Sequence, residues 1–213
     1  MGIAQLEPDL AGRHQIAYLH PGLNGVLMSI EEYQSINEWE PGYRYELIHG
    51  VLVVSPPPED AGQGPNERLG NWLWEYQQRH PQGKSLDETM MERPVRTRAG
   101  IRVVDRGLWI GYGRRIKSRR DLATILVEFV SAGKRAALRD YEEKRSEYLE
   151  AGAKEYWVID RFRRTMTVYF QSSAEPKERV VAESEIYTTP LLPGFELPLA
   201  QLFKLADHYA DEE

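Results

Sequence analysis

The segment ILVEFVS, residues 125–131, constrains the fold of this chain most strongly. In an extended segment alternate side chains share a face, so Glu128 points the same way as Leu126 and Val130. The opposite face is apolar throughout, which predicts a strand in the core of the protein. A charged carboxylate is costly to bury unless it is paired, protonated or bound to a metal. Glu128 is therefore the first candidate for a functional residue.

Strand-like and helix-like patterns follow one another along the 213 residues, a length that suits one domain. Their order predicts a mixed β-sheet flanked by helices, in the α/β or α+β class. The weak periodicity of residues 1–27 predicts an irregular or loosely docked extension, and residues 28–213 would form the domain. The expected elements are a helix from Ser29 to about Asn37 that begins with a capping box, a hairpin over 43–55, an amphipathic helix over 66–80, extended runs over 90–110, a strand over 124–131, a helix over 137–152, a hairpin over 155–171, and a strand near 179–182.

Composition narrows the chemistry and the compartment. The chain has no cysteine, which excludes disulfides, thiolate zinc sites and cysteine nucleophiles and suits a reducing cytosol. The N-terminus lacks the pattern of a secretory signal, and no apolar run approaches the roughly 20 residues that cross a bilayer. We therefore expect a cytoplasmic protein without a membrane segment.

Charge is distributed unevenly although the net charge is only −6. Residues 93–145 contain 15 Lys and Arg against 6 Asp and Glu, a local balance of +9, and the remainder carries −15. Such asymmetry is typical of a region that binds a polyanion. The loop of residues 111–121 contributes five of these basic residues, which we expect to contact a nucleic-acid backbone: Arg114, Arg115, Lys117, Arg119 and Arg120.

Three further ionisable residues occupy positions that look buried. Asp105 lies in the apolar run IRVVDRGLWI, and Glu46 lies in YRYELIHG. Lys144 shares one face of the expected helix with Tyr141 and Tyr148, at 3- and 4-residue spacing, and follows Asp140 by one turn. Buried charges need partners, and these groups could partner one another and Glu128.

Two carboxylates near a lysine suit metal-assisted phosphodiester hydrolysis. Carboxylate oxygens bind Mg²⁺, which keeps several waters and completes its shell with phosphate oxygens. A lysine can orient or help deprotonate the attacking water and offset charge on the phosphoryl group. Each residue also has a structural explanation: Glu128 at a sheet edge, Asp105 paired with an arginine, Lys144 in an i,i+4 pair, and Glu46 in a cross-strand pair.

The order of several motifs resembles a known family. YELIHGVLVVSPPP, VVDRGLWI, ILVEFVS, DYEEKRSEYLEAGAKEYWVID and LPGFELPLAQLF occur in the order seen in the Uma-type restriction endonucleases, a branch of the PD-(D/E)XK nuclease superfamily. The resemblance runs from about Met28 to the C-terminus. Its most specific part is the spacing of Asp140, Lys144, Tyr148 and Gly152 before EYWVID.

This resemblance implies a restriction-endonuclease-like fold, often a homodimer, with a nuclease site that uses Mg²⁺ and accepts Mn²⁺. Asp105 and Glu128 would bind the metal, Lys144 would be the family's lysine, placed on the helix, and Glu46 would match the acid of its ELIDG-like segment. Three positions depart from the family pattern: Val104 and Ala132 replace prolines, and Asn66 replaces a histidine.

The resemblance leaves three hypotheses for function. The first is a Mg²⁺-dependent DNA endonuclease. The second is a catalytically inactive DNA-binding module in which the acids form a buried ion-pair network. The third is a dimeric protein-interaction domain whose basic segment, residues 93–145, faces an acidic surface.

Overall fold

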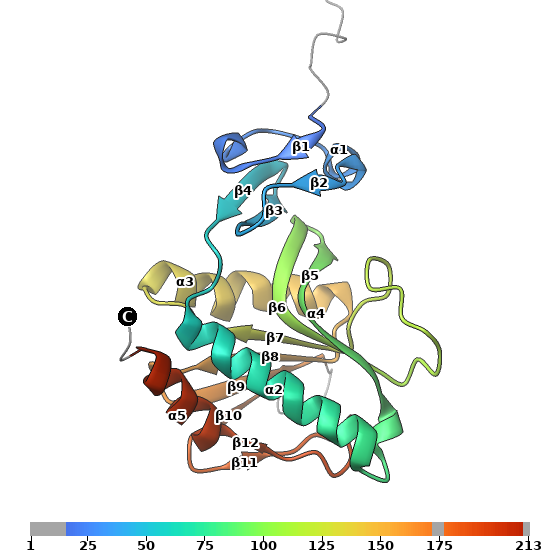
Figure 1. Cartoon of the computed structure of the whole chain (residues 1–213), viewed down its shortest axis with the longest axis vertical. Helices are drawn as coiled ribbons and strands as arrows, with labels where there is room; N and C mark the ends of the chain where they lie inside the picture. Colours follow the sequence, from blue (N-terminus) through green and yellow to red (C-terminus); the bar gives the residue numbers. More distant parts are fainter. Residues whose placement is uncertain (1–15, 172–176, 211–213) are drawn as a thin grey trace, which may run out of the picture.

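The computed structural model describes residues 16–171 and 177–210, and its main feature is a large mixed sheet (Figure 1). In the described part of the chain this sheet has eight strands, ordered β10-β9-β8-β7-β6-β3-β4, with β5 also paired to β6. All neighbours are antiparallel except β7 and β8. The strands are β3 (Arg44–Ile48), β4 (Val51–Ser55), β5 (Leu86–Thr97), β6 (Gly100–Ile110), β7 (Ile125–Phe129), β8 (Glu155–Asp160), β9 (Thr165–Phe170) and β10 (Glu178–Ala182).

Helices cover both faces of this sheet. On one face α2 (Asp60–Arg79) lies beside α5 (Leu199–Ala210), and Leu69 and Leu202 join the core that contains Val127. On the other face a helix formed by α3 (Lys134–Leu138), η4 (Arg139–Glu143) and α4 (Lys144–Ala151) packs Tyr148 into the core that contains Leu126. The expected class, a mixed sheet flanked by helices, is confirmed.

The strand that carries Glu128 is central and completely buried. Strand β7 lies between β6 and β8, and all five of its residues are buried. Its two apolar faces contact the two helical layers, as the sequence pattern predicted. The chain then crosses over through α3, η4 and α4 to the parallel strand β8, which places Lys144 above β7.

A smaller layer precedes the main sheet. It contains β1 (Tyr18–Leu19), η2 (Pro21–Leu23), α1 (Ile30–Ser35) and β2 (Glu38–Trp39), which lie next to β3 and β4 (Figure 1). We expected residues 1–27 to form an irregular or loosely docked extension, and the structure describes residues 16–27 of it. Leu19 pairs in β1 and is buried in a core with Leu47 and Leu52, because the apolar side of β3 and β4 needs a cover. Residues 1–15 lie outside the described residues.

Two local predictions are confirmed in atomic detail. Ser29 Oγ accepts the amide of Glu32 at 3.1 Å, and the Glu32 carboxylate accepts the amide of Ser29 at 2.6 Å, which completes the capping box of α1. The hairpin of β3 and β4 turns at His49 and Gly50, whose φ angles of 50° and 77° fit the tight turn of a two-residue hairpin.

Two helices differ from the prediction. Helix α2 begins at Asp60, six residues before the expected start at Asn66. Its glycine-rich first turns are poor helix formers, but packing that buries Ala61 and Pro65 overrides propensity. The expected helix 137–152 runs from Lys134 to Ala151 and contains the π-helical segment η4. Within α4, Glu147 is buried against Arg102, whereas Ala151, expected on the buried face, is exposed at the end of the helix.

Three short elements complete the described part of the chain. The short elements are η3 (Gly83–Ser85), β11 (Ile186–Tyr187) and β12 (Leu197–Pro198). Among residues 16–171 and 177–210, no helix combines the length and apolar character needed to cross a membrane.

Candidate active site

Asp105 and Glu128 lie at opposed positions on neighbouring strands. The antiparallel register of β6 and β7 pairs Arg106 with Val127 and Gly107 with Leu126, so the next position places Asp105 opposite Glu128. The paired ladder ends there, because further along β6 pairs with β3. Directly opposed residues of an antiparallel pair project on the same face. The structure thus brings together two acids that are 23 residues apart in the sequence.

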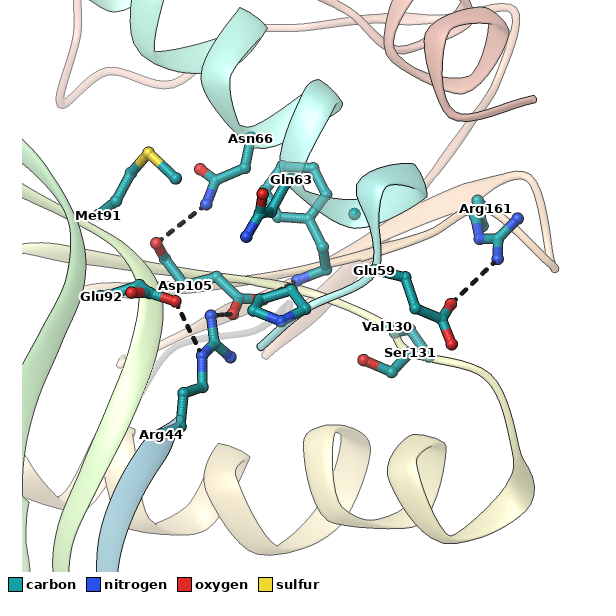
Figure 2. Close-up of a pocket in the computed structure, with 13 residues that line it drawn as sticks. Arg44, Glu59, Gln63, Asn66, Met91, Glu92, Asp105, Val130, Ser131 and Arg161 are labelled. Carbon is teal, nitrogen blue, oxygen red and sulfur yellow. Dashed lines mark hydrogen bonds and ion pairs between the residues drawn. The ribbon is translucent and has the colours of Figure 1, made fainter. Parts of the chain in front are cut away.

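The Asp105 carboxylate is held by two donors. The amide of Phe129 donates to Oδ2 at 2.7 Å, and Nη2 of Arg44 lies 2.6 Å from Oδ1. Arg44 also donates from Nε to Glu92 at 3.1 Å, as Figure 2 shows. Burial alone would raise the pKa of Asp105, but the charge of Arg44 holds it below its ordinary value. Asp105 is therefore ionised at neutral pH, with a cation beside it.

The Glu128 carboxylate is buried and contacts groups from the helix above it. Its Oε1 lies 2.8 Å from Nζ of Lys144 and accepts the hydroxyl of Tyr148 at 2.9 Å. Burial raises the pKa of Glu128 to about 8, and the charge of Asp105 acts in the same direction while Lys144 opposes it. Both of these neighbouring groups contact the same oxygen, Oε1.

Lys144 joins two carboxylates. Besides Glu128, its ammonium contacts Asp140 at 3.4 Å, one helical turn earlier and in the π segment. Its side chain is only 3 % exposed. Burial alone would lower the pKa of Lys144, but the charges of Glu128 and Asp140 raise it above its ordinary value. Lys144 is consequently a fixed cation, so its contribution is a positive charge.

Glu46 and Asn66 act on the backbone around Asp105. Glu46 is buried, and its Oε1 accepts the amide of Val103 at 2.9 Å. Asn66, on α2, donates to the carbonyl of Asp105 at 3.0 Å and accepts Nε of Arg106 at 2.7 Å. Glu46 reaches Lys144 only through its charge, which also raises the lysine's pKa. Both residues fix β6 on either side of the acid.

A small cavity opens beside the Asp105 carboxylate. Its volume is about 20 Å³, and Arg44 forms part of its wall with Gln63, Asn66 and Ser131 (Figure 2). A cavity needs roughly 10–15 Å³ of such volume to hold one water, so this one has room for a single water. A ligand larger than a water therefore requires Arg44 to move.

The oxygen donors suit a hard cation that keeps part of its water shell. Asp105 and Glu128 offer carboxylate oxygens, the ligands that Mg²⁺ prefers. Among the described residues, no group of three or more Asp, Glu, His or Cys is arranged to hold a metal ion. The two acids could thus supply only part of a coordination shell, and Arg44 now neutralises one of them. The donor chemistry fits Mg²⁺ if the guanidinium leaves.

The basic loop divides into two parts. Arg114 pairs with Asp121 at 2.7 Å and 2.8 Å through both terminal nitrogens, which reduces its availability to a ligand. Arg115 and Lys117 are exposed, and Arg119 and Arg120 line a separate cavity. The loop follows the C-terminal end of β6, which is five residues beyond Asp105.

Sequence reasoning did not identify Arg44. A signal was present, because Arg44 and Glu46 are two positions apart on β3 and so project on the same face. Asn66 was recognised only as a departure from a family pattern. Its buried side-chain amide donates a hydrogen bond to the Asp105 carbonyl. A contact between residues this far apart in the sequence cannot be read from a local pattern.

Comparison with known proteins gives one family and one fold. The model of the family described as Uma2, putative restriction endonuclease, matches residues 30–200. A solved structure described as a putative nuclease belonging to DUF820 from Anabaena variabilis is 15 % identical, with a TM-score of 0.64, and the alignment covers 84 % of this chain and 99 % of that chain. At this identity the likeness shows the fold alone. No curated protein matches the chain.

Proposed function

The chain belongs to the Uma2 family of putative restriction endonucleases, and we propose that it is a Mg²⁺-dependent endonuclease that hydrolyses phosphodiester bonds in DNA. One observation carries the proposal. Asp105 and Glu128 occupy opposed positions on β6 and β7, and Glu128 contacts the buried ammonium of Lys144. Two acids and a lysine that come from three elements are the groups that metal-assisted hydrolysis requires.

Each residue would have a role that follows from its contacts. Asp105 and Glu128 would hold the metal ion, which when bound would polarise the phosphoryl group and lower the pKa of a water. Lys144 would keep Glu128 oriented and supply fixed positive charge near the phosphate, because its raised pKa makes it a poor base. Glu46 and Asn66 would hold the β6 backbone so that Asp105 keeps its position.

Arg44 would leave Asp105 when metal and substrate bind. Its guanidinium is 2.6 Å from Oδ1, where it compensates the buried charge. Its other contact, Glu92, is 46 % exposed, so the ion pair between them is a weak restraint. A displaced guanidinium next to the site would be suited to bind a phosphate oxygen.

Nicking of supercoiled plasmid tests the assignment. The wild type with Mg²⁺ or Mn²⁺ should nick, whereas Asp105→Asn and Glu128→Gln should each lose at least about 100-fold in rate, roughly the effect of removing a principal electrostatic group. Glu142→Gln, which removes an exposed acid of η4, is the matched control. Equal nicking by all four proteins would overturn the proposal and would identify a contaminating nuclease.

A second candidate function is a DNA-binding module that does not cleave. The observation that favours it is that both carboxylate oxygens of Asp105 already have partners within the protein. A module of this kind would bind DNA equally well with EDTA and with Mg²⁺ and would leave plasmid intact. The homodimer and the cytoplasmic location remain predictions.

A further inference from the structure

Four arginines surround a second cavity, which shares no lining residue with the cavity beside Asp105. The cavity has a volume of about 130 Å³ and lies between β5, the loop of residues 111–124 and the end of α4. Its walls include buried Val104, Trp109 and Leu126. Two arginines come from β5 and two from the loop: Arg93, Arg96, Arg119 and Arg120.

These four guanidiniums have no acidic partner. Within residues 16–171 and 177–210 none of them forms an ion pair, whereas Arg44, Arg102 and Arg139 each pair with a carboxylate. The one acid that lines the cavity, Asp121, is already used. Its carboxylate accepts hydrogen bonds from both terminal nitrogens of Arg114 and from the amide of Lys117. The cavity therefore carries uncompensated positive charge.

One donor in this cavity lacks an acceptor. Nε of Arg93 is buried and has no hydrogen-bond partner in the described protein. Buried donors are nearly always satisfied, and an exception points to a water, an ion or a ligand group. This N–H group is thus available to an acceptor from outside the protein. This observation is independent of the charge count, because it concerns one specific N–H group.

The chemistry of the walls selects an oxyanion. Guanidinium groups donate two parallel hydrogen bonds to oxygens of one planar or tetrahedral anion, and they favour phosphate. The volume exceeds the roughly 30 Å³ of one water several-fold, so the cavity has room for a tetrahedral anion. Four arginines that do not pair with the cavity's one acid, Asp121, suit the several oxygens of a phosphate better than a ligand carboxylate, which offers only two.

The position of the cavity relates it to Asp105. Glu92 and Arg93 are consecutive on β5: Glu92 contacts Arg44 at the Asp105 site, and Arg93 lines the cavity. Among the described strands β5 pairs only with β6, so its other edge has no strand partner. A nucleic-acid strand that crosses this edge would pass from one site to the other.

We propose that the four-arginine cavity binds a phosphodiester group of the same nucleic-acid strand whose scissile phosphate lies at Asp105. The inference rests on the proposed function for the identity of the strand, but the cavity itself is argued from its own residues. It assigns roles to Arg93 and Arg96, which lie outside the basic loop.

Fluorescence anisotropy of a labelled oligodeoxynucleotide in EDTA tests the proposal without cleavage. Arg93→Gln should weaken binding about 10-fold and reduce the slope of log K against log salt by about 1. The matched control is Arg98→Gln, which removes a charge from the turn after the same strand, where Arg98 pairs with exposed Glu150 at 3.1 Å. This control should change the affinity less than 2-fold. The double substitution Arg119→Gln with Arg120→Gln repeats the test from the loop and serves if Arg93→Gln does not fold.

Titration of inorganic phosphate by calorimetry distinguishes the two sources of a phosphate group. Weak binding of phosphate that Arg93→Gln abolishes, together with the loss of DNA affinity, supports the proposal. Tight phosphate binding with unchanged DNA affinity in Arg93→Gln overturns it in favour of a free phosphate ligand. Equal losses in Arg93→Gln and Arg98→Gln overturn it as well, because general charge would then explain both. Since EDTA prevents metal-dependent cleavage, an inactive nuclease would leave this result unaffected.

Discussion

The guanidinium of Arg44 lies 2.6 Å from the carboxylate of Asp105, at the point where β6 leaves β7 and pairs with β3. A cation from the protein thus compensates the acid that we propose to bind metal. Such a contact lets a buried carboxylate stay ionised in the absence of metal, because an uncompensated buried charge would be far more costly. Because of the same contact, a metal ion would have to compete with Arg44 for the Asp105 carboxylate.

Replacing Arg44 by Gln should therefore tighten metal binding. We expect about 10-fold higher affinity for Mn²⁺, about 1.4 kcal/mol, because the ion no longer displaces a guanidinium. Calorimetric titration at pH 8.5, where Glu128 is largely ionised, measures it. Arg68→Gln removes an exposed charge from α2 and is the control. Weaker binding in Arg44→Gln would show that Arg44 supports the site and does not compete for it.

Lys144 should be essential for stability as well as for the site. Lys144→Met leaves Glu128 and Asp140 buried without their cation, and we expect a loss of about 3–5 kcal/mol in the free energy of unfolding. Urea denaturation followed by tryptophan fluorescence measures this loss. Lys134→Met, an exposed position on the same helix, should lose less than about 0.5 kcal/mol.

Adding Glu128→Gln to Lys144→Met should recover part of that loss, because the charge left without a partner is removed. A double variant as unstable as the sum of the two single variants would show that the ion pair is not the cause. The comparison is a double-mutant cycle, in which two residues in direct contact should couple.

Asn66 should stabilise the β6 backbone at Asp105. Asn66→Ala removes the amide that donates to the Asp105 carbonyl and the oxygen that accepts from Nε of Arg106, so we expect a loss of about 1–3 kcal/mol. Burial already lowers the pKa of Arg106 to about 10, which reflects a charge without a carboxylate contact. Asn71→Ala, exposed on the same helix, is the control for helix propensity. Equal unfolding midpoints of the two variants in urea would contradict this role.

The ion pair of Glu147 with Arg102 should set part of the acid limit of stability. Burial alone would raise the pKa of Glu147, but the hydrogen bonds from Arg102 lower it below its ordinary value. A lowered folded-state pKa adds stability above the unfolded value of about 4.3, and this stability is lost as the pH falls through the folded-state pKa. The difference in unfolding free energy between wild type and Glu147→Gln should therefore shrink between pH 6 and pH 3. A difference that grows on acidification would contradict this assignment.

Local pattern determined the elements and much of their order. The apolar run around Glu128, the capping box at Ser29 and the turn at His49 each depend on residues that are neighbours in sequence, so the pattern contained the information. The sequence also singled out Asp105, Glu128 and Lys144, because a charge within an apolar pattern is visible without coordinates. Their proposed chemistry remains to be tested.

Tertiary structure decided how these charges are paired. The register of β6 against β7 sets Asp105 opposite Glu128, and a shift of one residue would have turned one of them to the other face. Arg44 reaches Asp105 across 61 positions of sequence, and the four arginines of the second cavity meet only because the loop folds back on β5. The sequence by itself determined which residues must find partners, since burial follows from local hydrophobic pattern. Which partners they found depended on strand pairing and helix packing, because those contacts join segments that no local pattern relates.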